Sequence, residues 1–87
     1  MTDLAYTDGN SLAGPLSEMF SFDITGASTT CVGCRRRSSV AELHVYAAGP
    51  GSVARCPGCD AVILRYARTP TSAFVDLRGT FALSIPC

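Results

Sequence analysis

The chain has 87 residues, and its seven arginines balance seven acidic residues, so the formal net charge is zero. This length allows one domain, which buries only about 60 to 65% of its unfolded surface, so we expect a small core that needs reinforcement. Apolar residues make up 47% of the chain, which argues against a disordered polymer, and no apolar run reaches the ~18 residues that span a membrane.

The first residues, MTDLAYTDGN, lack the basic and apolar regions of a secretory signal. We therefore expect a cytoplasmic protein with no membrane partner. In the cytoplasm, paired cysteines bind metal or perform redox chemistry more often than they form structural disulfides.

The segment 12–20 has apolar residues at the spacing of one helical face (Leu12, Leu16, Met19 and Phe20). Pro15 falls near its start, where a missing backbone donor costs little. We predict a short helix over 12–20 that covers the domain's own core. The expected organisation is an N-terminal helical segment, 1–25, that packs on a four-cysteine domain, 26–87.

Strand-like sequence dominates from residue 40 onward. The segment 40–47, VAELHVYA, alternates apolar and polar residues, and AGPG at 48–51 is typical of a turn before SVARC, so we predict a β-hairpin. The segment 61–68, AVILRYAR, breaks the alternation as a strand covered on both faces would. AFVDLR and TFALSIP predict two further strands. The fold class is therefore small and mainly β, with an antiparallel sheet of four or five strands and a short N-terminal helix.

Two CxxC pairs, CVGC and CPGC, are separated by 21 residues that contain the predicted hairpin. A thioredoxin-type redox pair opens a helix after a strand, whereas strand-like sequence follows both pairs here. One redox pair would also leave the other unexplained. We therefore predict a four-thiolate metal site, with the ligands Cys31, Cys34, Cys56 and Cys59.

Four thiolates suit one tetrahedral zinc ion per chain, with Zn–S distances near ~2.3 Å. Because a closed set of four protein ligands leaves no position for water, we expect structural rather than catalytic zinc. Iron is the alternative, since CPGC resembles a knuckle of the rubredoxin-like proteins. Those proteins surround the site with several aromatic residues, whereas here the neighbouring sequence is RRR and the chain has no tryptophan.

The two knuckles, the hairpin between them and the strand after the second resemble the zinc-ribbon superfamily. More narrowly, DGNSLAGPLSEMF, AELHVYAAGPGSVARCPGCDAVILR and DLRGTFALSIP resemble a family of short zinc-ribbon proteins from high-GC bacteria. The resemblance covers nearly the whole chain. It implies the zinc-ribbon fold and the four cysteine ligands, and it implies no activity.

For function, we expect a non-catalytic zinc-ribbon adaptor module that mediates protein interaction and is not an enzyme. One alternative is a nucleic-acid or transcription-associated zinc ribbon, in which Arg35, Arg36 and Arg37 contact phosphates; the pI of about 6.5 disfavours it. A second alternative is an iron-binding accessory protein of a redox enzyme. His44 lies on the polar face of its predicted strand, and we interpret it as a structural residue.

The C-terminal sheet surface is the expected contact with a partner. A helix of nine residues spans only ~14 Å and cannot cover a sheet of four or five strands that lie ~4.8 Å apart. Exposed apolar side chains should therefore remain and support self-association or binding of another protein; the candidates are Phe74, Phe81, Leu83 and Ile85. Cys87 is expected to be a free thiol.

Overall fold

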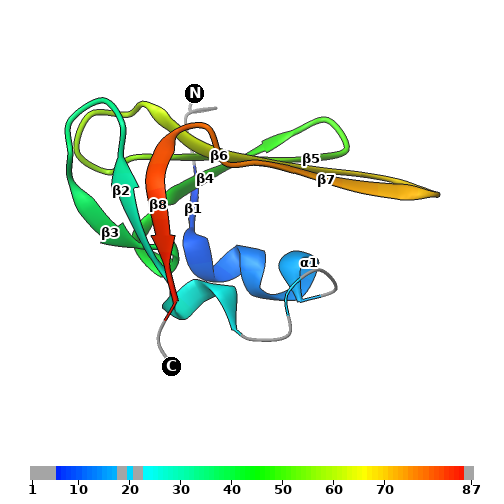
Figure 1. The fold of residues 1–87 in the computed structure, drawn as a ribbon. Coiled ribbons are helices and arrows are strands. Elements are labelled where there is room, and N and C mark those ends of the chain that lie inside the picture. The colour runs from blue at the N-terminus through cyan, green and yellow to red at the C-terminus, as the bar shows by residue number, and fades with distance from the viewer. Residues whose placement is uncertain (1–5, 18–19, 21–22, 86–87) are drawn as a thin grey trace.

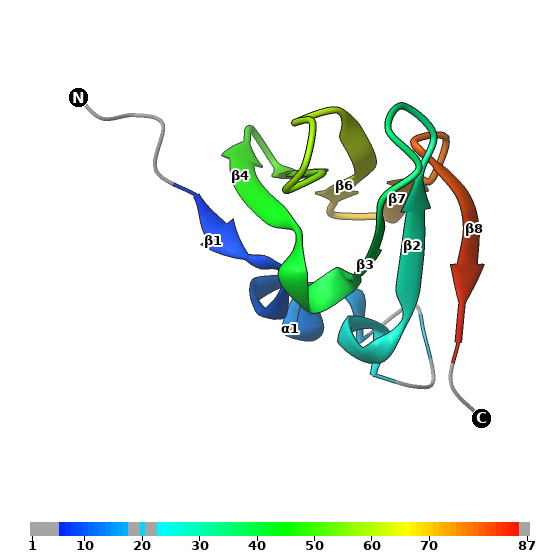
Figure 2. The ribbon, with the colours of Figure 1, turned by 90° about the vertical axis from the view of Figure 1, so that its left-hand side faces the viewer.

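The structure is a computed structural model, and it describes residues 6–17, 20 and 23–85. Two antiparallel β-sheets and a group of short helices form the fold, and Figure 1 shows the helices gathered on one side of the larger sheet. Figure 2 shows the smaller sheet standing beside the larger one. The predicted mainly-β class with antiparallel pairing and one short α-helix is confirmed.

The larger sheet contains, in spatial order, β1 (Thr7–Asp8), β4 (His44–Ala48), β5 (Gly51–Arg55), β6 (Val62–Thr69) and β7 (Ser72–Asp76). The smaller sheet contains β3 (Arg37–Ser39), β2 (Ser28–Cys31) and β8 (Thr80–Ser84). The helical elements are η1 (Gly9–Leu12), α1 (Ala13–Leu16), η2 (Ile24–Gly26) and η3 (Val40–Glu42), of which only α1 is α-helical. None of the helices in the described residues is long and apolar enough to cross a membrane.

The N-terminal helical segment begins earlier than the sequence predicts. The carboxylate of Asp8 accepts a hydrogen bond from the amide of Asn10 at 3.0 Å, so the 3₁₀ turn η1 starts at Gly9. The α-helical part is limited to the four residues of α1, and positions 18 and 19 of the expected helix lie outside the described residues. Leu12 and Leu16 are each 1% exposed, so this segment faces the core as expected.

The predicted hairpin between the cysteine pairs is confirmed, but its first strand is shorter. Strands β4 and β5 pair from His44 opposite Arg55 to Ala48 opposite Gly51. Gly49, in the turn, has a φ of 59°, a left-handed value that favours glycine. Residues 40–42, which the alternation assigned to the strand, form η3 instead, because Glu42 folds back and accepts a hydrogen bond from the Ser39 amide at 2.8 Å.

The C-terminal strands divide between the two sheets, which the sequence did not predict. Strand β6 lies between β5 and β7, and its adjacent residues Ile63 and Leu64 are 1% and 2% exposed, which confirms that it is covered on both faces. Strand β8 leaves this sheet and pairs with β2. At the crossing, the Val32 amide donates to the carbonyl of Gly79 at 3.0 Å, and the hydroxyl of Thr80 donates to the carbonyl of Thr30 at 3.0 Å.

One apolar core joins both sheets and the helical segment. Its members come from nearly every element, and two of the cysteines, Cys31 and Cys56, are among them. The other buried apolar members are Leu12, Leu16, Ile24, Ala27, Val40, Leu43, Val45, Ala54, Ile63, Leu64 and Tyr66. The cysteine cluster is therefore continuous with the core.

Candidate metal centre

Each cysteine pair lies in a tight turn between two strands of one sheet, and the two turns have the same backbone hydrogen bonds. In the first knuckle, between β2 and β3, the Cys31 amide donates to the carbonyl of Arg36 and the Arg35 amide donates to the carbonyl of Cys31, both at 2.9 Å. In the second knuckle, between β5 and β6, the Cys56 amide donates to the carbonyl of Ala61 at 2.8 Å and the Asp60 amide donates to the carbonyl of Cys56 at 2.9 Å. The matching bonds present the cysteines of both turns in the same way.

The residue after the second cysteine of each knuckle has a left-handed backbone. Arg35 has a φ of 69° and Asp60 a φ of 67°, and these are the only non-glycine residues with positive φ in the described part of the chain. Aspartate tolerates this conformation better than most residues, whereas arginine has no such advantage. In the second knuckle, the Gly58 amide also donates to Cys56 Sγ at 3.3 Å, as expected for an amide that stabilises a thiolate.

The structure brings the four predicted cysteines together. Their Sγ atoms all lie within 4.8 Å of one another, and the two cross-knuckle pairs, Cys31–Cys59 and Cys34–Cys56, are each 3.6 Å apart. Sulfur atoms bound to one tetrahedral zinc at ~2.3 Å would be separated by about 3.8 Å. A disulfide requires about 2.05 Å, so the four cysteines are free thiols. The donor set therefore fits one soft metal ion.

The four thiols differ in burial and in their tendency to ionise. Cys31 and Cys56 are buried, and Cys34 and Cys59 are exposed. Burial opposes ionisation of Cys31, but the amides of Cys34 and Gly33 and the neighbouring thiols lower its pKa to about 7. The Ala61 amide favours the Cys59 thiolate, but the sulfur atoms around it raise the pKa of Cys59 to about 11. The cluster thus resists a second negative charge, and a central cation would relieve that repulsion.

Arginine side chains surround the two knuckles. Arg35, Arg36 and Arg37 are all exposed, and the Arg36 Nε donates to the hydroxyl of Ser38 at 3.1 Å. Arg55, which the sequence analysis did not single out, donates from Nη1 to the carbonyl of Asp60 at 2.8 Å and so ties the end of β5 to its own knuckle. The feature of the sequence that could have identified Arg55 is its position directly before Cys56.

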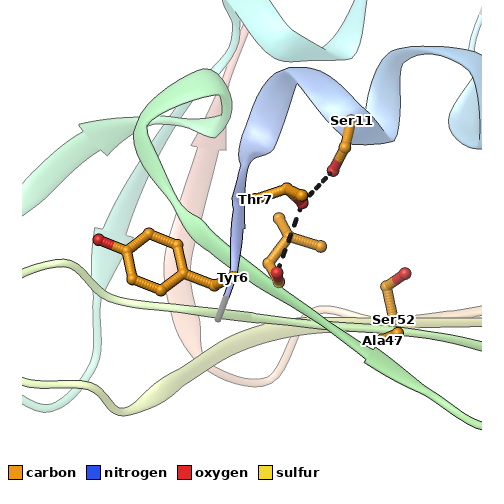
Figure 3. Close-up of a pocket in the computed structure, with 6 residues that line it drawn as sticks. Tyr6, Thr7, Ser11, Ala47 and Ser52 are labelled. Carbon is orange, nitrogen blue, oxygen red and sulfur yellow. Dashed lines mark hydrogen bonds between the residues drawn. The ribbon is translucent and has the colours of Figure 1, made fainter. Parts of the chain in front are cut away.

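Among the described residues, the cluster of possible metal ligands contains the four cysteines and does not include His44. The His44 ring stacks on that of Tyr6, with 3.9 Å between the ring centroids. Beside Tyr6 is an open hollow of about 350 Å³, in which the Thr7 hydroxyl donates to that of Ser11 at 3.0 Å (Figure 3). The described side chains that line it carry no carboxylate, imidazole or thiol; they are Tyr6, Thr7, Ser11, Val45, Ala47 and Ser52.

The predicted C-terminal apolar surface is present in part. Phe74, Phe81 and Ile85 are 57%, 56% and 44% exposed. The prediction that Leu83 belongs to this exposed surface is wrong, because its side chain is partly buried and packs against the core. Val32, in the first knuckle, is a further apolar residue with 43% exposure.

Comparison with known proteins identified a family. The model of a family described as a family of unknown function (DUF6510) matches residues 3–87. No curated protein and no solved structure matches the chain. The family description states no activity, and the zinc-ribbon superfamily and the high-GC bacterial origin stay predictions.

Proposed function

The chain belongs to the DUF6510 family of unknown function, and we propose that it is a non-catalytic zinc-binding module that mediates protein interaction. The observation that supports zinc is the close approach of four thiols from two matching knuckles, with cross-knuckle sulfur distances of 3.6 Å. Soft thiolate donors in a tetrahedral arrangement suit zinc or iron. Arginine and small residues around the knuckles favour zinc over iron.

A structural role for the metal follows from what it would join. The first knuckle belongs to the smaller sheet and the second to the larger one, so one ion held by Cys31, Cys34, Cys56 and Cys59 would link both sheets. Structural zinc contributes on the order of 10 kcal/mol of apparent binding free energy to small domains. When bound, the ion would neutralise thiolate charge, and four protein ligands would leave it no open position for a substrate.

Two observations support a binding role over a catalytic one. The hollow beside Tyr6 is lined by hydroxyl and apolar groups, which offer no acid–base pair near neutral pH. Phe74 and Phe81 are more than half exposed, and exposed apolar groups commonly mark contacts with another chain. We also infer a cytoplasmic location, because reducing conditions keep the four thiols available for metal.

Metal analysis of the purified protein tests this proposal, and the fifth cysteine supplies a matched control. The wild type and Cys87→Ser should each hold one zinc per chain and be colourless, whereas Cys59→Ser should lose most of its zinc. Affinity capture from the native host should recover a specific protein with the wild type and not with Cys59→Ser. A coloured iron protein, or a metal content near zero, would contradict the zinc assignment, and a protein that captures nothing would contradict the interaction role.

A further inference from the structure

The first knuckle carries exposed apolar and cationic side chains that the core does not use. We call Val32, Arg35, Arg36, Arg37 and Phe81 the knuckle patch. Val32 is 43% and Phe81 56% exposed. Val32, Arg35 and Arg36 lie in the β2–β3 loop, Arg37 is the first residue of β3, and Phe81 lies at the start of β8. The loop and the start of β8 lie side by side in both views (Figures 1 and 2).

The conformation of Arg35 indicates that its side chain, rather than its backbone, accounts for an arginine at this position. The two knuckles have the same hydrogen bonds, and both place the residue after the second cysteine at a φ near 70°, 69° for Arg35 and 67° for Asp60. Glycine adopts this φ without strain, so arginine offers no backbone advantage at this position. The Arg35 guanidinium instead lies 4.5 Å from the centroid of the Phe81 ring, a cation–π contact that holds both groups at the surface.

The remaining arginines make the patch cationic. Arg36 lies against the second knuckle, where a Cβ added to Gly58 would be 3.0 Å from its Cδ, and its Nε donates to the hydroxyl of Ser38 at 3.1 Å. Arg35 and Arg37 are exposed, and among the described residues no carboxylate forms an ion pair with either. Two guanidinium groups therefore accompany an exposed apolar pair, with no acidic partner in the described part of the chain.

We propose that the knuckle patch binds a segment of another protein in which carboxylates flank an apolar side chain. This inference rests on the proposed interaction function and names the chemistry of its partner. Carboxylates fit guanidinium groups bidentately, and arginine and aromatic residues are enriched among the residues that dominate binding energy. Nucleic acid fits less well, because the net charge is zero and the pI is about 6.5, whereas nucleic-acid-binding domains present a larger basic face.

Selection from a library of random short peptides on the zinc-loaded full chain tests the partner chemistry. We expect enriched peptides with acidic residues on both sides of an aliphatic or aromatic residue. Binding of a synthetic peptide with the enriched sequence should weaken at least about tenfold in Arg35→Gly and in Phe81→Ser. It should not change in Phe74→Ser, which removes an equally exposed phenylalanine, at 57%, from the larger sheet.

Arg35→Gly is the more informative variant, because glycine suits the left-handed backbone and should leave the fold and the zinc content intact. Zinc per chain is measured for every variant, so loss of the metal site is distinguished from loss of peptide binding. Enriched peptides without acidic residues, no enrichment, or binding that ignores both patch variants would overturn this inference while the zinc assignment stands. A short mixed-sequence RNA that binds more tightly than the best peptide at equal salt would overturn it in favour of nucleic acid.

Discussion

Zinc should set the stability of this domain, because the two knuckles belong to different sheets that the ion would join. A domain of 87 residues has a total stability of about 4 to 13 kcal/mol. Structural zinc contributes about 10 to 16 kcal/mol of apparent binding free energy, which is as large as that total. We therefore expect the metal-free chain to be largely unfolded.

The dependence of the free energy of unfolding on the concentration of free zinc also has a defined slope. One ion that binds only the folded chain raises the free energy of unfolding by about 1.4 kcal/mol for each tenfold increase in free zinc above the dissociation constant. Urea unfolding at 25 °C, in a series of zinc buffers under reducing conditions, measures this slope by circular dichroism. Cys87→Ser should give the same slope as the wild type, and Cys59→Ser should give a much smaller one.

Two results would refute this reasoning. A slope near zero, with native amide signals retained after chelation, would show that the metal does not hold the sheets together. A slope near twice the expected value would show that two ions bind per chain.

Three further expectations concern the fold around the site. Gly79→Ala should destabilise the protein by about 3 kcal/mol in urea unfolding, because the new Cβ would lie 1.8 Å from a backbone carbonyl oxygen. The control is Gly26→Ala, whose Cβ would meet nothing within 4 Å and which should be nearly neutral. Equal effects of the two substitutions would contradict this prediction. Leu16→Ala should cost about 3 kcal/mol by the same assay, because Leu16 is 1% exposed, and a cost below about 1 kcal/mol would show that this segment packs loosely. Hydrogen bonds from Arg78 lower the pKa of Asp76 from its ordinary value of 3.8 to about 2. The interaction therefore stabilises the fold at pH values above 3.8, and this stabilisation is lost as the pH falls toward 2. In Arg78→Ala, the pKa of Asp76 measured by NMR titration should rise toward 3.8 without reaching it, because the backbone amide of residue 78 still donates to the carboxylate; an Asp76 pKa that stays near 2 would contradict this.

The sequence could predict the features that depend on local patterns. The spacing of the four cysteines identified the cluster, and the turn sequence around Gly49 identified the hairpin. Unbroken apolar residues at Ile63 and Leu64 identified a strand covered on both faces. The hairpin and the covered strand depend on residues close together in the chain, and the cysteine cluster was predictable because the same short CxxC motif occurs twice.

One error came from a local signal that was overlooked. Residues 40–47 alternate as a strand would, but Ser39 and Glu42 stand three apart, which is the spacing of a capping box. In the structure this pair starts the 3₁₀ turn η3, and the strand begins only at His44. A capping signal directly before an alternating segment therefore outweighs the first residues of the alternation.

The division into two sheets had no local signal. Strand β8 pairs with β2, and the Thr80 hydroxyl bonds to Thr30, which lies 50 residues earlier in the chain. The crossing also needs a residue without a side chain at Gly79, where the backbone of β6 comes close. Because such contacts join segments far apart in the chain, the alternation in β8 indicated a strand without indicating its partner.

The unequal burial of the cysteines explains how one site can serve both the core and the surface. Cys31 and Cys56 are 1% and 2% exposed and belong to the apolar core. Because a small domain buries too little surface to be very stable, a metal bound to these two cysteines would reinforce the core. Cys34 and Cys59 face solvent, and Arg35 follows Cys34 directly on the same turn. Loss of the metal would therefore remove the turn that presents Arg35 against Phe81. A partner that binds this surface would, by linkage, also favour the metal-bound fold.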